Sequence, residues 1–253
     1  MLSIENVYMN YHAKSGETHA LANINLHIEK GEFVSIVGPS GCGKSTLLSI
    51  IAGLLEPSAG RVMIKGDIVN KPKKEIGYML QRDHLFEWRN ILQNALLGLE
   101  ILGELSPENI SYTHFLLDKY GLGEFKKMRP SELSGGMRQR AALIRTLATR
   151  PEILLLDEPF SALDYQVRLN VSREIHEILQ KEEKTAILVT HDISEAIALS
   201  DRVAILSARP SYIKSIQQID FGTLDPIQKR ESAEFPVYFN KIWKELEIDE
   251  PGA

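Results

Sequence analysis

The N-terminal part of the chain has the hydrophobic pattern of a small sheet. Residues 3–28 alternate polar with apolar positions and are rich in Val, Tyr, Ile and Asn, which predicts two strands joined by a polar turn at residues 12–18. A helical run over residues 44–54 ends at the Pro- and Gly-containing segment 57–60, and residues 61–65 have the pattern of another strand. These patterns predict an N-terminal antiparallel β subdomain.

Short, largely apolar runs predict a second, parallel sheet. Residues 32–37, 153–156 and 186–189 are such runs, which are typical of strands covered on both faces. A charged helical pattern over residues 164–182 lies between the last two runs. This strand–helix–strand order predicts an α/β core with a parallel sheet.

The middle of the chain has a mainly helical pattern of apolar positions. A strand pattern over residues 76–80 ends at Gln81, and helical periodicity then prevails to about residue 150, with breaks at Gly121, Gly123 and Pro130. We therefore predict one domain over residues 1–220 with a helical subdomain inserted at about residues 82–150. A C-terminal helical tail is expected over residues 221–253.

The tail carries apolar residues at spacings near three and four, which predicts an amphipathic helix. We expect this helix to pack on its own domain, and a regulatory or dimer contact is the alternative. The residues concerned are Phe235, Val237, Phe239, Ile242, Trp243 and Leu246.

Composition narrows the classes of function. The 253 residues are 43% hydrophobic and 25% charged with a net charge of −5, which is typical of a globular protein and disfavours a nucleic-acid partner. A single cysteine, Cys42, excludes a disulfide within the chain. No apolar run approaches the roughly 18 residues of a membrane span, and the first ten residues lack a signal-peptide pattern. We expect a cytoplasmic protein whose membrane role, if it has one, comes through a partner.

One segment matches the phosphate-binding P-loop pattern G-x-x-x-x-G-K-[ST]. Glycines let backbone N–H groups surround phosphate oxygens, and the following helix presents its positive end to the same anion. Lys44 then reaches the β- and γ-phosphates, and the Ser45 hydroxyl binds Mg²⁺. The alternative is a glycine-rich turn that binds nothing. The loop consists of Gly38, Pro39, Ser40, Gly41, Cys42, Gly43, Lys44, Ser45 and Thr46.

Two adjacent carboxylates end the apolar run at 153–156. Side chains alternate along a strand, so Asp157 and Glu158 point in different directions and cannot share one task. We expect Asp157 to hold the Mg²⁺ shell and Glu158 to act as general base on an attacking water. A solvated Asp-Glu turn is the alternative.

Several further motifs resemble those of ATP-binding-cassette (ABC) ATPases. Residues 133–137, Leu-Ser-Gly-Gly-Met, resemble the family's signature motif and lie between the P-loop and the carboxylate strand. Gln81 matches the Q-loop, residues 161–164 match the D-loop with Asp164, and His191 matches the switch histidine. Tyr11 lies where the family places an aromatic residue that stacks on adenine, although Tyr8 and His12 are nearby. The resemblance covers about residues 1–215.

The resemblance implies a P-loop ATPase fold, ATP and Mg²⁺ as cofactors, and a head-to-tail homodimer. Ser134, Gly135 and Gly136 form a second anion-binding helix start, which in the family faces the partner's nucleotide. Gln81 is then expected to sense the γ-phosphate and Mg²⁺, and His191 to hydrogen-bond the γ-phosphate or the water. A satisfied surface histidine is the other interpretation of His191.

Finer features are similar to the nitrate/sulfonate/taurine branch of the family. They are Met137, where Gln is usual, and the stretches 81–89, 191–196 and 207–210. Members of that branch energise importers fed by an extracytoplasmic solute-binding protein, which implies permease partners and a peripheral position on the cytoplasmic face of the membrane. Some similar proteins serve pyrimidine or riboflavin-type vitamin precursors.

The family places its contact with the membrane subunit at about His84, Trp88 and Arg89, and a packed Trp88 is the alternative. Other classes of function also stay open. A cassette ATPase in DNA repair, ribosome work or iron–sulfur assembly is one, and a regulatory binding module is another.

Overall fold

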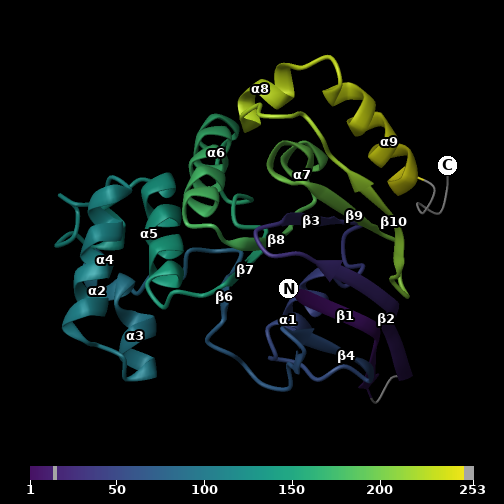
Figure 1. Ribbon diagram of the computed structural model, residues 1–253, viewed down its shortest axis with the longest axis horizontal. Coiled ribbons are helices and arrows are strands. Elements are labelled where there is room, and N and C mark those ends of the chain that lie inside the picture. The colour runs from purple at the N-terminus through teal and green to yellow at the C-terminus, as the bar shows by residue number, and fades with distance from the viewer. Residues whose placement is uncertain (14–15, 248–253) are drawn as a thin grey trace. The chain divides into compact units, whose positions relative to one another are not determined.

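The computed structural model describes residues 1–13 and 16–247, which belong to two compact units (Figure 1). The first unit consists of Met1–Lys73 and the chain from Glu182 onward, and the second is Lys74–Lys181. Residues 14–15 of the predicted turn and residues 248–253 of the predicted tail lie outside the described residues.

The first unit contains the predicted antiparallel sheet, in the order β2-β1-β4-β5. His12 pairs with Glu17, so the turn at residues 12–18 is shorter than predicted. β4 begins two residues before the predicted strand, because Ala59 already pairs with Tyr8 of β1. Gly60 has a φ of +83° and lies so close to β1 that a Cβ there would lie 2.1 Å from the Asn6 carbonyl oxygen. The strands are β1 (Leu2–Ala13), β2 (Gly16–Ile28), β4 (Ala59–Ile64) and β5 (Asp67–Ile68).

Four strands of the first unit form a second, mostly parallel arrangement. β3 (Phe33–Val37) lies between β8 (Thr185–Val189) and β9 (Arg202–Leu206), both parallel to it. β10 (Ile213–Gln218) pairs with β9 in the antiparallel direction. All the residues of β3 and β8 are buried, as their apolar runs predict. α7 (Ile193–Leu199), which follows β8, and the strands β9 and β10 after it lie in a stretch for which no element was predicted.

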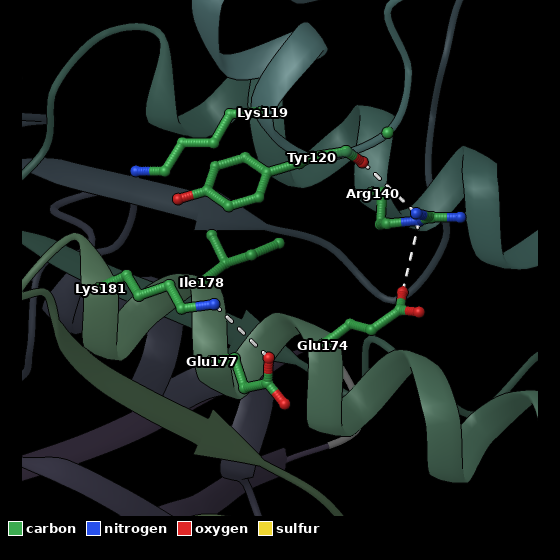
Figure 2. Close-up of a pocket in the computed structure, with 8 residues that line it drawn as sticks. Lys119, Tyr120, Arg140, Glu174, Glu177, Ile178 and Lys181 are labelled. Carbon is green, nitrogen blue, oxygen red and sulfur yellow. Dashed lines mark hydrogen bonds and ion pairs between the residues drawn. The ribbon is translucent and has the colours of Figure 1, made fainter.

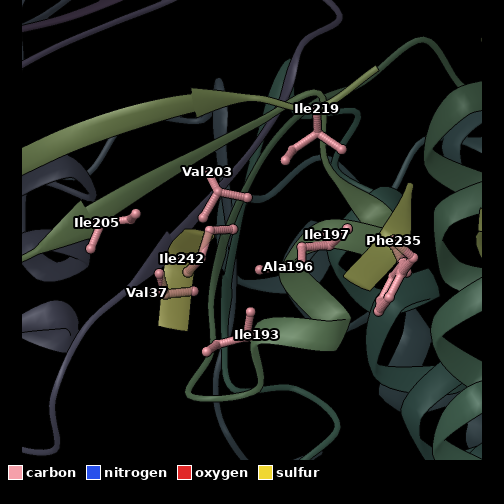
Figure 3. Packing of buried hydrophobic residues seen from close by; sticks show 10 residues of the cluster. Val37, Ile193, Ala196, Ile197, Val203, Ile205, Ile219, Phe235 and Ile242 are labelled. Carbon is pink, nitrogen blue, oxygen red and sulfur yellow. The ribbon is translucent and has the colours of Figure 1, made fainter. Parts of the chain in front are cut away.

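The C-terminal helices pack on this same unit. α8 (Pro226–Glu231) and α9 (Phe235–Glu247) follow β10, and Ile242 of α9 is fully buried in one cluster with Val203 and Ile205 of β9 and Ile197 of α7 (Figure 3). The prediction that the tail helix packs on its own domain is confirmed.

The buried face of α9 is narrower than the sequence pattern indicated. Val237 is 68% exposed and Trp243 is 47% exposed, so neither contributes to the core. A polar contact completes the attachment, because the Gln217 amide of β10 donates to a carboxylate oxygen of Glu245 at 3.0 Å.

The second unit combines two parallel strands with helices. β6 (Ile76–Met79) pairs with β7 (Ile153–Asp157). Ser106 caps α4 ahead of Pro107 at its first turn, which is why a helix starts there. Residues 82–150 contain four α-helices, as the periodicity predicts, and an irregular turn precedes the first of them. The helices are α2 (Ile91–Ala95), α3 (Leu97–Leu102), α4 (Pro107–Lys119) and α5 (Gly135–Leu147), and α6 (Tyr165–Lys181) follows β7.

Among the described residues, no helix is both long and apolar enough to cross a membrane. The division at residue 220 and the helical insert at 82–150 stay predictions.

Candidate functional site

The P-loop of the first unit connects β3 to α1 (Lys44–Ile51). Gly41 and Gly43 have φ angles of +74° and +117°, in the region that side chains rarely adopt. At Gly38 an added Cβ would lie 3.0 Å from Leu206 Cβ of the neighbouring strand β9. The glycines therefore allow the backbone conformation of the loop and its close approach to β9. Because they have no side chains, they leave the backbone N–H groups of the loop uncovered.

Lys44 is folded into this loop. Its side chain is 6% exposed, and Nζ donates to the carbonyl oxygens of Gly38 at 2.8 Å and Pro39 at 3.0 Å. Ser45 follows at the start of α1 with an exposed side chain, and Cys42 is buried as a small loop residue. The loop thus holds one buried cation, Lys44, and exposed hydroxyl side chains at Ser40 and Ser45.

Tyr11 reaches the same region from β1. Its hydroxyl lies 3.2 Å from Thr46 Oγ1, and the side chain is 40% exposed, so part of the ring faces solvent. The neighbouring His12 instead faces Glu17 across the hairpin at 3.8 Å. The structure therefore brings Tyr11 to the P-loop.

His191 lies at the same edge of the sheet as the P-loop. Ile36 of β3 is in register with Val189 of β8, so both parallel strands end side by side. The backbone around His191 is fixed by Thr190, whose hydroxyl accepts from Asp192 N at 3.0 Å and donates to Glu195 at 2.8 Å. The His191 side chain is exposed.

In the second unit, β6 and β7 also end at a common edge. Met79 is in register with Leu156, so Asp157 and Glu158 follow directly. Asp157 is 9% exposed and accepts a hydrogen bond from the Tyr78 hydroxyl at 3.2 Å. No role was predicted for Tyr78, although its place next to the end of β6 brings it close to the carboxylates that end β7.

Glu158 and Gln81 meet at this edge. The Gln81 amide donates to a Glu158 carboxylate oxygen at 3.3 Å. Glu158 has a left-handed φ of +45°, which is unusual for a residue with a side chain. The Ser161 hydroxyl donates to the Glu158 carbonyl at 3.0 Å and closes the turn. Two predicted catalytic residues are thus in direct contact.

Two arginines of α5 hold the segment after Gln81. Arg138 Nε pairs with Asp83 at 3.1 Å, and Arg145 donates to the carbonyl oxygens of Asp83 and His84, each at 2.7 Å. Burial lowers the pKa of Arg145, and the nearby Asp83 carboxylate opposes that shift. No role was predicted for either arginine from the sequence. Their spacing of seven residues places both on one face of a helix, and this spacing indicates that the two side chains can hold the same segment.

The Ser-Gly-Gly turn forms the start of α5. The Ser134 hydroxyl accepts from Met137 N at 3.3 Å, as a helix cap does. A Cβ on Gly135 would lie 3.0 Å from Leu163, and one on Gly136 would lie 2.7 Å from Val171 of α6. These glycines therefore allow α5 to lie close to α6. Asp164 caps α6 in turn by accepting from Val167 N at 3.1 Å.

Trp88 lies on the surface of the second unit. It is 70% exposed and stacks on Phe86, with ring centroids 4.6 Å apart. Their turn is held by buried Asn94, which accepts from Phe86 N at 2.7 Å and donates to the Arg89 carbonyl at 3.2 Å. Trp88 is thus presented on an ordered turn and is not a buried core residue.

A separate hollow of 210 Å³ lies among α4, α5 and α6 (Figure 2). Its charges are largely matched, because Arg140 pairs with Glu174 at 3.4 Å and Lys181 with Glu177 at 3.6 Å. Lys119 lies over the Tyr120 ring, 5.2 Å from its centroid. Two of the three cations that line the hollow are thus paired with carboxylates.

Comparisons with known proteins agree with these features. A family model described as ABC transporter matches residues 21–161. The chain is 49% identical to the uncharacterized ABC transporter ATP-binding protein YtlC of Bacillus subtilis, over 97% of this chain and 95% of that one. It is 40% identical to the taurine import ATP-binding protein TauB of Ruegeria pomeroyi, over 88% and 84% of the two chains.

A solved structure is similar as well. The dimeric, post-hydrolysis structure of the ATP-binding cassette MJ0796 bound to ADP and Pi matches with a TM-score of 0.73 and 31% identity. The match covers 88% of this chain and 100% of that one. The fold of the described residues is therefore that of a known nucleotide-binding cassette.

Proposed function

The chain belongs to the ABC transporter family, and from that premise we propose that it is the ATP-hydrolysing subunit that energises a solute importer. The observation that carries this proposal is the P-loop, in which the buried ammonium of Lys44 donates to the carbonyl oxygens of Gly38 and Pro39 beside the left-handed glycines Gly41 and Gly43. A loop of bare N–H groups beside a cation and a helix start suits a polyphosphate. We assign the β- and γ-phosphates of ATP to it, and the adenine to Tyr11.

Hydrolysis requires a base for the attacking water. We assign this role to Glu158, which removes a proton from water as the oxygen attacks the γ-phosphorus and the bond to the β-phosphate oxygen breaks. The hydrogen bond from Gln81 supports this assignment because it holds one carboxylate oxygen in place. His191 is assigned to a hydrogen bond with the γ-phosphate or the water.

The residues present also fit Mg²⁺. Among residues 1–13 and 16–247, no three His, Cys, Asp or Glu side chains gather into a metal site, so a cation here would need oxygens of the bound phosphates. The exposed hydroxyl of Ser45 and the carboxylate of Asp157 are hard oxygen donors of the kind Mg²⁺ prefers, and Gln81 adds an amide oxygen. When bound, Mg²⁺ neutralises charge on the phosphate oxygens.

We also propose that the working form is a homodimer in which Ser134, Gly135 and Gly136 face the partner's nucleotide. The similar cassette MJ0796 forms a dimer with ADP and Pi, which supports this assignment. Asp164 is assigned to the same interface, because it caps α6 with an exposed side chain next to the Ser-Gly-Gly turn.

Transport requires a membrane permease, and we propose that the chain binds one at the cytoplasmic face of the membrane. The exposed Trp88 is the proposed contact. The similarity to TauB, a taurine import ATP-binding protein, supports the importer role, and an extracytoplasmic solute-binding protein is the proposed source of the solute. The proposed solute is nitrate, a sulfonate, taurine or a vitamin precursor.

Replacement of Glu158 by Gln tests the catalytic assignment. Gln keeps the size and the contact with Gln81 but cannot accept the proton, so turnover is expected to fall by about 10²-fold or more. ATP binding is expected to persist, and analytical ultracentrifugation is expected to show an ATP-bound dimer.

Glu177→Gln is the matched control, because Glu177 is a half-buried residue of α6 that pairs with Lys181 and has no assigned role. Its turnover is expected to equal that of the parent chain. Parental turnover in the Glu158 variant would exclude Glu158 as the base.

A further inference from the structure

A second hollow, of 320 Å³, opens beside the P-loop within the first unit. One side is the loop, and the other is the turn that connects β9 to β10. The lining residues are Pro39, Ser40, Gly41, Cys42, Ala208 and Arg209. Arg209 is the cation of this group, and none of the roles assigned above includes it.

The turn that carries Arg209 is firmly built. Ser207 N donates to the Tyr212 carbonyl, and Tyr212 N donates to the Ser207 hydroxyl, both at 3.0 Å. Ser211 is joined to β2, because its N–H donates to the Ala20 carbonyl at 3.0 Å and its carbonyl accepts from Ala22 N at 2.8 Å. The position of Arg209 beside the loop is therefore fixed by the fold on both sides of the turn.

The P-loop braces the same turn. Leu206, the last residue of β9, lies against Gly38, where a Cβ would come within 3.0 Å of Leu206 Cβ and 3.2 Å of its carbonyl oxygen. Any side chain at position 38 would push loop and turn apart. The close approach thus keeps Arg209 next to Ser40 and Gly41.

Two cations therefore border one short segment of backbone. Lys44 Nζ bonds to the Pro39 carbonyl at 3.0 Å and lies 4.0 Å from Cys42 Sγ, and both of these residues also line the hollow. Within residues 1–13 and 16–247, the Arg209 guanidinium is engaged in neither a hydrogen bond nor an ion pair. A planar guanidinium with five donors suits an oxyanion that offers several acceptors.

We propose that Arg209 is a second phosphate-binding cation, which contacts the terminal phosphate of a nucleoside triphosphate held in the P-loop of the same chain. This inference rests on the proposed nucleotide site and adds a residue to it. The hollow is formed by the loop residues themselves, which favours a ligand held by that loop over a contact with another protein. Arg209 then favours triphosphate over diphosphate, because its partner is absent from ADP.

The test compares two nucleotides on the Arg209→Ala variant. Calorimetric titration with a non-hydrolysable ATP analogue is expected to show about tenfold weaker binding, which corresponds to about 1.4 kcal/mol. ADP binding is expected to change by less than about threefold, since contacts to the β-phosphate are untouched. Arg209→Lys keeps the positive charge but lacks the planar guanidinium, so it is expected to retain part of the affinity that Arg209→Ala loses.

Arg61→Ala is the matched control. Arg61 belongs to the same unit and pairs on its surface with Glu5 at 2.8 Å. Removing it is expected to leave both affinities unchanged, which excludes a general effect of net charge.

Three outcomes would overturn the inference. Equal affinity of the Arg209→Ala variant and the parent chain for the ATP analogue would exclude the contact. An equal loss for ADP and the analogue would show a distorted loop. Unchanged affinity with a weaker dimer in ultracentrifugation would assign Arg209 to the partner chain. Failure of the parent chain to bind either nucleotide would instead contradict the proposed function itself.

Discussion

At the scale of single residues, the predicted site residues are held by contacts that their motifs did not specify. Lys44 is fixed by carbonyl oxygens of its own loop, and Glu158 by the Gln81 amide at 3.3 Å. Asp157 receives the Tyr78 hydroxyl. The motifs predicted which residues belong to the site, and these neighbours hold their side chains in place.

Tyr11 offers a sharp test because Tyr8 lies on the same strand with nearly the same exposure, 39% against 40%. If the Tyr11 ring stacks on adenine, Tyr11→Ala is expected to weaken ATP binding by about tenfold, in the range known for base–aromatic stacking. Tyr11→Phe keeps the ring and loses only the contact with Thr46, so it is expected to bind almost normally. Calorimetric titration with ATP measures both variants.

Tyr8→Ala is the matched control and is expected to bind ATP as the parent chain does. A loss of affinity for Tyr8→Ala but not for Tyr11→Ala would transfer the adenine contact to Tyr8.

At the scale of elements, the sequence predicted best the strands that precede the motifs. β3 and β7 are short apolar runs that end where the phosphate and carboxylate motifs begin, so their pattern was unambiguous. α7 was missed because six of its seven residues are buried, which leaves no polar face to give a helical period. β10 was missed because it is a largely polar strand paired with β9.

The contact between Gln81 and Glu158 could not be derived from the sequence. It depends on the register of β6 against β7, in which Met79 lies opposite Leu156. A shift of one residue would turn every side chain of the strand to the other face. The family resemblance named both residues, and the pairing of the strands explains why they meet.

The packing of α5 on α6 gives a prediction at this scale. Gly136→Ala places a methyl group 2.7 Å from Val171 Cγ2, so the helices must separate. We expect a loss of about 1–3 kcal/mol in the free energy of unfolding, measured by urea denaturation. Val171→Ala in the same chain removes the obstructing methyl groups and is expected to recover part of that loss.

The comparison is a double-mutant cycle, because the two residues are in contact. Strictly additive effects of Gly136→Ala and Val171→Ala would contradict the proposed clash. A large loss of ATPase activity without any loss of stability would show that Gly136 serves nucleotide binding directly.

At the scale of the whole molecule, one face of the second unit has the features of a docking surface. Trp88 and Phe86 are stacked on a turn that Asn94 holds with hydrogen bonds to Phe86 N and the Arg89 carbonyl. An exposed aromatic pair on an ordered turn is typical of binding surfaces. The same turn follows Gln81, which contacts the proposed base.

A photo-reactive amino acid at position 88, introduced in cells that contain the natural partners, is expected to form an adduct with an integral membrane protein. The same group at position 243 is the control, because Trp243 is also exposed, at 47%, on the tail helix. Gel electrophoresis and mass spectrometry identify the adducts. Adducts at position 88 with ribosomal proteins or DNA, and none with a membrane protein, would contradict the transport role.

The place of β3 also bears on how the protein is synthesised. Both strands that flank β3 come from the chain beyond residue 181, whereas β3 itself ends at Val37. A ribosome that has released only residues 1–181 has therefore made the whole second unit, but it has left an apolar strand with two unpaired edges. Such a strand is a template for aggregation. Prematurely terminated translation products are thus expected to need a chaperone until the chain beyond residue 181 supplies β8 and β9.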